Sequence, residues 1–130
     1  MKIMVCYDDS RSSKEALRLA KEHARAFNGS ITIVTSMTKG TDSEKQDIEK
    51  AEVDLEFEKK SCIEDGIECK THLLIRGLSA GEDLVQFAQD ENIEEIIIGV
   101  KRRSKVEKLV FGSTAQYVIL KSHCPVVTVK

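Results

Sequence analysis

The sequence predicts an α/β protein whose parallel sheet carries helices on both faces. Short runs of apolar and β-branched residues alternate with longer segments that place apolar residues at helical spacing. Strict alternation of this kind is typical of a parallel sheet, because each crossover between parallel strands needs a helix. The chain has 130 residues, which suits one ordinary domain, so we expect residues 1–130 to form a single domain.

The first strand and the first helix are predicted at the start of the chain. Lys2–Tyr7 (KIMVCY) is rich in strand formers, and Asp8-Asp9-Ser10 follows as an acidic turn. Ser12 and Glu15 have capping-box spacing and are expected to begin the helix. Asn28-Gly29 ends it with residues that tolerate the left-handed conformation. The expected inward face consists of Ala16, Ala20, Ala24 and Phe27.

A second strand and a long charged helix come next. Ile31–Met37 (ITIVTSM) is β-branched through most of its length, and Thr38–Asp42 is expected to be a loop. Ser43–Asp65 is dense in charge, which is usual for the solvated face of a helix, and Asp65-Gly66 ends it. The expected inward residues are Ile48, Ala51, Leu55 and Cys62.

The third unit repeats the same order. Glu68–Ile75 is the expected third strand, and Arg76-Gly77 a turn. Ser79 and Glu82 form another capping box. Leu84, Val85 and Ala88 give the helix behind it a buried stripe.

The last third of the chain supplies two strands and a short helix. Glu95–Gly99 is the fourth strand, and Ser113–Ser122 a helix with Ala115, Val118 and Ile119 inward. Pro125–Val129 is the fifth strand, with the proline at its first position, where a missing donor is tolerated.

Composition excludes several classes of function. Twenty lysines and arginines against 22 aspartates and glutamates give a formal net charge of -2, so we expect neither nucleic acid nor an anionic membrane as a partner. No apolar run approaches the ~20 residues of a membrane span. The four cysteines fit no zinc spacing and indicate free thiols in a reducing cytosol, so we expect a cytoplasmic protein.

The segment after the fourth strand is the strongest candidate for function. Lys101, Arg102, Arg103 and Lys105 make it basic, and Gly112-Ser113-Thr114 then begins a helix. The first amides and the dipole of a helix favour an anion by about 0.3–1 kcal/mol. Ligands of parallel sheets bind beyond the carboxyl ends of the strands, which is where both features fall. The plainer alternatives are a solvated basic loop and ordinary helix capping.

The whole chain resembles the universal stress proteins. The resemblance rests on the opening KIMVCYDDS, on EEIIIGV, on FGSTAQYVI and on the closing CPVVTV. It implies a Rossmann-like sheet of the adenine nucleotide alpha hydrolase type, with five parallel strands in the order 3-2-1-4-5. It also implies binding of ATP or AMP for stress response or signalling rather than efficient catalysis, and a homodimer paired through the last strand. A magnesium ion beside the phosphates and slow ATP hydrolysis stay open.

The ATP-binding branch of that family carries a glycine, two residues, a second glycine, nine residues and then Gly-Ser or Gly-Thr. Gly99 and Gly112-Ser113 match the two ends, but Arg102 stands at the second glycine. If that position requires a positive φ, arginine there costs about 1 kcal/mol or more. Alternatively, Arg102 itself reaches the phosphates beside Lys101 and Arg103, and the basic neighbours favour this second interpretation. The rival function is a dimeric interaction or scaffold protein of the same family that binds no nucleotide.

Other residues are assigned by their match to family positions. Asp8 matches an acidic residue near the base and ribose, and Asp9 either holds a metal with the phosphates or shapes the turn, which we favour. Thr35 and Ser36 match the end of the second strand, where family backbone groups meet adenine, so we expect little from their side chains. The predicted nucleotide site therefore comprises Asp8, Asp9, Ser10, Thr35, Ser36, Gly99, Lys101, Arg102, Arg103, Gly112, Ser113 and Thr114.

Overall fold

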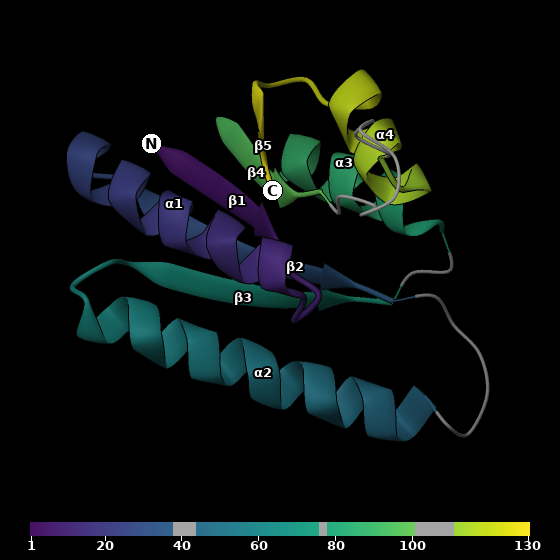
Figure 1. The fold of residues 1–130 in the computed structure, drawn as a ribbon, viewed down its shortest axis with the longest axis horizontal. Coiled ribbons are helices and arrows are strands. Elements are labelled where there is room, and N and C mark those ends of the chain that lie inside the picture. The colour runs from purple at the N-terminus through teal and green to yellow at the C-terminus, as the bar shows by residue number, and fades with distance from the viewer. Residues whose placement is uncertain (38–43, 76–77, 101–110) are drawn as a thin grey trace.

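A computed structural model describes residues 1–37, 44–75, 78–100 and 111–130. Five strands form one parallel sheet in the order β3-β2-β1-β4-β5, which confirms the predicted class and strand order (Figure 1). The strands are β1 (Lys2–Cys6), β2 (Ser30–Ser36), β3 (Cys69–Leu74), β4 (Glu95–Gly99) and β5 (Val126–Val129). The helices are α1 (Arg11–Phe27), α2 (Glu44–Glu64), α3 (Ala80–Asp90) and α4 (Ser113–Lys121).

The helices divide between the two faces of the sheet. Ile3 and Val5 of β1 pack with α1 and α2, whereas Met4 and Cys6 pack with α3 and α4. Figure 1 shows α2 lying along β3, and α3 and α4 side by side beyond β4. A central strand is buried on both faces, which is why Ile3–Cys6 of β1 form a continuous hydrophobic run. No helix in the described part of the chain has the length and apolar character that crossing a bilayer needs.

The start of α1 differs from the prediction. Ser10, not Ser12, is the N-cap, and its Oγ accepts a hydrogen bond from the backbone N–H of Ser13 at 3.2 Å. Two further bonds fix this choice, because Ser10 N–H donates to Asp8 Oδ1 and Ser13 Oγ donates to the Ser10 carbonyl. The helix therefore begins one residue before Ser12, and the capping-box prediction for Ser12 and Glu15 was wrong.

The inward face of α1 was predicted correctly apart from its last member. Ala16, Ala20 and Ala24 are buried, but Phe27 is 61% exposed at the end of the helix, where its ring meets the edge of His23. Asn28 takes the left-handed conformation expected of it, with φ 51°.

The remaining helix ends agree with the sequence where they are described. Gly66 follows α2 with φ 77°, and the Ser79 hydroxyl accepts from the N–H of Glu82 at the start of α3. Phe87 of α3 is buried although the predicted stripe omitted it. The predictions for 38–43, including the loop and the first residue of the second helix, and for Arg76-Gly77 lie outside the described residues.

Candidate functional site

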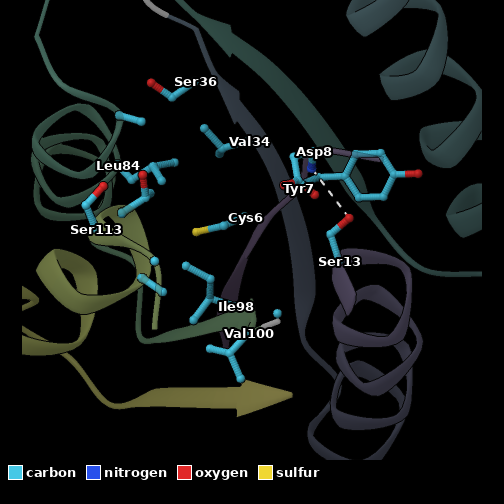
Figure 2. A pocket seen from close by; sticks show the side chains of 15 residues that line it. Cys6, Tyr7, Asp8, Ser13, Val34, Ser36, Leu84, Ile98, Val100 and Ser113 are labelled. Atoms are coloured by element: carbon cyan, nitrogen blue, oxygen red, sulfur yellow. Dashed lines mark hydrogen bonds between the residues drawn. The ribbon is translucent and has the colours of Figure 1, made fainter. Parts of the chain in front are cut away.

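The sheet has a switch point between β1 and β4, where a cavity opens. The helix that follows β1 in the chain, α1, lies on one face of the sheet, and the helix that follows the neighbouring strand β4, α4, lies on the other. A cavity of about 450 Å³ lies at their carboxyl ends (Figure 2). This is the expected ligand position in such a sheet, and the volume suits a small molecule.

The cavity brings together predicted residues from four separate segments. Its lining includes Asp8, Ser36, Gly99, Gly112, Ser113 and Thr114. Asp9 and Thr35 instead line an adjacent cavity of about 270 Å³ between the strand ends and α2. Ser10 caps α1, and Lys101, Arg102 and Arg103 lie outside the described residues. The role of Arg102 thus stays a prediction.

Sequence reasoning missed the apolar wall of the cavity. The wall consists of Cys6, Val34, Leu84, Ile98 and Val100 (Figure 2). Burial raises the pKa of the Cys6 thiol to about 12, and the nearby Asp8 carboxylate adds to the effect, so this thiol stays neutral. Cys6, Val34 and Ile98 are paired neighbours near the carboxyl ends of three adjacent strands, and their side chains lie on the face that α3 and α4 cover. Apolar residues at the ends of adjacent strands are the sequence signal that could have identified this wall.

The start of α4 forms one side of the cavity. Its N-cap is Gly112, which has no side chain to bond the first amides of the helix, whereas Ser10 and Ser79 provide such bonds in α1 and α3. Ser113, Thr114 and Ala115 of the first turn line the cavity. The first amides of a helix need partners, and the dipole favours an anion as that partner.

Gly99 is required by packing as well as by the predicted loop. A Cβ at this position would lie 2.5 Å from the carbonyl carbon of Ser12 and 2.6 Å from its oxygen. The first turn of α1 therefore rests directly on the end of β4. By contrast, a Cβ at Gly112 would meet nothing within 4 Å.

Asp9 shapes the turn after β1 and ties it to neighbouring helices. Its backbone is left-handed, with φ 62°, and its carboxylate accepts from Lys50 Nζ at 3.1 Å and from Tyr7 Oη at 3.2 Å. Lys14 Nζ lies 3.4 Å away. The bond from Lys50 is the main cause that lowers the pKa of Asp9. In the described part of the chain, no three His, Cys, Asp or Glu side chains gather to hold a metal ion.

Tyr7 connects both cavities to α2. Its single O–H hydrogen is shared between two carboxylate acceptors, Asp9 Oδ1 at 3.2 Å and Glu58 Oε1 at 3.1 Å, although only 4% of the residue is exposed. Burial and then the Glu58 carboxylate raise the pKa of Tyr7 well above its usual value. The folded protein therefore strongly favours the neutral phenol.

Replacing Tyr7 with phenylalanine should reveal this preference in alkali. Below the unfolded-state pKa of about 10, the wild type should be more stable by about 1–3 kcal/mol, because hydrogen bonds to carboxylates are lost in the variant. As pH rises above about 10, the unfolded wild-type chain ionises at Tyr7 and the folded chain resists, so this advantage should shrink. Urea denaturation of both proteins at several pH values checks it, and a constant difference across that range would contradict the assignment.

The two polar residues at the end of β2 bond inside the protein. Thr35 Oγ1 donates to the Tyr7 carbonyl at 2.7 Å. Ser36 Oγ donates to Asp83 Oδ2 at 3.3 Å. Asp8, which is exposed at the cavity, also receives the bond from Ser10 N–H.

The fold and the cavity define a class of protein: a Rossmann-like α/β domain with a ligand-sized cavity at the switch point of its sheet. The family model for the universal stress protein family matches residues 1–130, and the chain belongs to this family.

Individual relatives agree with that membership. A universal stress protein of Methanocaldococcus jannaschii is 36% identical over 72 residues, which cover 55% of this chain and 41% of the relative. The chain thus spans less than half of that relative. A solved universal stress protein from Archaeoglobus fulgidus is 34% identical with a TM-score of 0.87, over 100% of this chain and 93% of that one. A second structure from that organism, a complex with dAMP, is 33% identical with a TM-score of 0.82, over 100% and 98%.

Proposed function

We propose that the protein binds an adenine nucleotide, ATP or AMP, in the cavity between β1 and β4. The observation that carries this proposal is the pairing of an apolar wall with the start of α4, whose N-cap glycine leaves the first amides for a ligand. A nucleotide has the matching parts, because its base is largely apolar on its faces and its phosphate is anionic. The dAMP complex of the Archaeoglobus fulgidus relative supports the same ligand class.

The residues divide into three roles under this proposal. Val34, Leu84 and Ile98 pack against the base or ribose. The amides and hydroxyls of Ser113 and Thr114 hold a phosphate, and charge-assisted hydrogen bonds of this kind contribute about 1.5–3 kcal/mol each. Lys101, Arg102 and Arg103 add positive charge to the chain just before α4.

Nucleotide-dependent thermal stabilisation tests the proposal. A ligand present at about 100 times its Kd adds about 2.7 kcal/mol to the free energy of unfolding, which for a chain of this size raises Tm on the order of 10 °C. We expect this shift with millimolar AMP or ATP, with and without Mg²⁺, on protein stripped of carried-over nucleotide. Adenosine, which lacks the phosphate, is the control and should shift Tm less. No shift with ATP, ADP or AMP would overturn the proposal.

One sequence feature supports the rival function of an interaction protein without nucleotide. Arg102 stands where the ATP-binding branch has its second glycine. Extracting fresh protein and measuring adenine absorbance separates the two functions. Arg102→Gly should strengthen nucleotide binding if the rival is correct, and weaken it or leave it little changed if Arg102 is a phosphate donor.

We further propose that the nucleotide serves as a signal in the cytosol and is not turned over rapidly. Phosphate release from ATP measures this directly. Turnover at rates typical of enzymes, about 1 per second or faster, would contradict a signalling role.

We also propose that the protein forms a homodimer through β5. This strand lies at one edge of the sheet and pairs with β4 along its other side. Val126, Val127 and Val129 are half-buried, and a short apolar edge is usually covered or paired. Light scattering at micromolar concentration should give twice the chain mass of 14.5 kDa. A monomeric mass would count against this interface.

A further inference from the structure

Ser36 lies where the two cavities at the ends of the strands adjoin. Ser36 ends β2 and lines both cavities, together with Tyr7 and Asp8. Figure 2 shows it at the edge of the larger cavity, beyond Val34.

The partner of this hydroxyl is a buried carboxylate. Asp83 is 0% exposed and lies in the first turn of α3, where its N–H donates to the Ser79 carbonyl. The start of a helix favours negative charge, so this is a suitable position for a buried carboxylate. Its Oδ2 lies 3.3 Å from Ser36 Oγ.

This contact decides which kind of hydrogen bond Ser36 offers to a ligand. A serine hydroxyl has one hydrogen and two lone pairs, and in this contact the Ser36 hydroxyl is the donor and Asp83 Oδ2 the acceptor. The hydrogen of Ser36 is therefore directed to Asp83, and the oxygen lone pairs remain for the cavity. A group that only accepts hydrogen bonds would be repelled there, and a donor group would be matched.

We propose that Ser36, with its hydrogen held by Asp83, is a specificity-determining residue that accepts a hydrogen bond from a donor group of the nucleotide. The donor is the 6-amino group of the base or a ribose hydroxyl, since both have the required chemistry. Asp83 is the positioning residue that keeps the Ser36 oxygen in the accepting state. The inference rests on the proposed nucleotide function and gives it a chemical criterion for choosing among nucleotides.

Four ligands and one substitution test the proposal. Titration calorimetry would compare wild type and Ser36→Ala with AMP, purine riboside monophosphate, 2′-deoxy-AMP and 3′-deoxy-AMP, each analogue lacking one donor. Ser36→Ala should weaken AMP binding by about 2- to 12-fold, the range for one uncharged hydrogen bond. For the one analogue that lacks the recognised donor, the two proteins should bind equally. That analogue identifies the donor as the amine or a particular hydroxyl.

Two further variants separate specificity from structure. Ser36→Thr keeps the hydroxyl and should retain the wild-type order of the four ligands. Asp83→Asn can donate to Ser36 and release its hydrogen into the cavity, so it should reduce AMP affinity by a similar factor. Melting temperatures without ligand would record any change in stability separately from these ratios.

The outcomes distinguish a wrong role for Ser36 from a failure of the proposed nucleotide binding. Equal weakening of all four ligands by Ser36→Ala, or no weakening of AMP, would overturn the role of Ser36 while leaving nucleotide binding in place. A wild-type protein that binds none of the four ligands would overturn the proposed function and this inference with it.

Discussion

Ser113→Glu is expected to abolish nucleotide binding without unfolding the protein. Ser113 is the exposed first residue of α4 and lines the cavity beside Gly112. A carboxylate here would occupy the position proposed for phosphate and would repel it. Two unit charges 4 Å apart near a protein surface interact by about 4 kcal/mol, and allowing for screening at this exposed position we expect affinity for AMP to fall at least about 100-fold.

The same substitution should leave stability unchanged or slightly raised. A negative charge in the first turn of a helix is favourable by about 0.3–1 kcal/mol. Loss of binding together with retained stability is a combination that a general packing defect would not produce. Ser113→Gln is the matched control, since it has the same size without the charge and should lose much less affinity. If the glutamate variant bound AMP as tightly as the glutamine variant, the phosphate would have to lie elsewhere.

Gly99→Ala is expected to give the largest loss of stability among the glycine positions of the site. The new Cβ would lie within 2.7 Å of the Ser12 backbone and Cβ, atoms in the first turn of α1 that cannot rotate away. Forcing a methyl group into such a contact costs about 1–3 kcal/mol, occasionally more. Urea denaturation should show a lower midpoint with an unchanged slope.

Gly112→Ala provides the comparison for that experiment. Its Cβ would enter open space, and the backbone at Gly112 has φ -64°, which any residue can adopt. We expect a cost below about 1 kcal/mol, because alanine is only a poorer N-cap than glycine. Equal losses for the two variants would mean that α1 does not rest on β4 as described.

The strands and helices were predictable because each has a clear pattern in the sequence: apolar β-branched runs for the strands and capping residues for the helices. In the sequence, β2 and β4 are β-branched apolar runs, and the helices between strands carry serine caps or left-handed end residues. The strand order came from family resemblance and not from these patterns. Periodicity identifies elements but does not say which strands become neighbours.

The errors arose where tertiary contacts choose between equivalent local signals. Ser10, Ser12 and Ser13 are all good capping residues. Ser10 is the N-cap because its N–H is held by Asp8 and its hydroxyl accepts from the N–H of Ser13, while Ser12 packs against Gly99 inside the helix. The bond between Ser36 and Asp83 joins residues 47 positions apart. No spacing rule in the sequence anticipates such a contact.

The polar contacts around Tyr7 and Asp9 connect α2 to the turn after β1, which lines both cavities. Glu58 and Lys50 of α2 hold the turn after β1 through the phenol of Tyr7 and the carboxylate of Asp9. Lys50 is largely exposed, so its contact is weak, while the bond between Tyr7 and Glu58 is partly buried and stronger. Any sliding of α2 along the sheet must either break these bonds or pull the turn with it. These bonds therefore couple the position of the outer helix to that of the turn after β1, whose residue Asp8 lines both cavities.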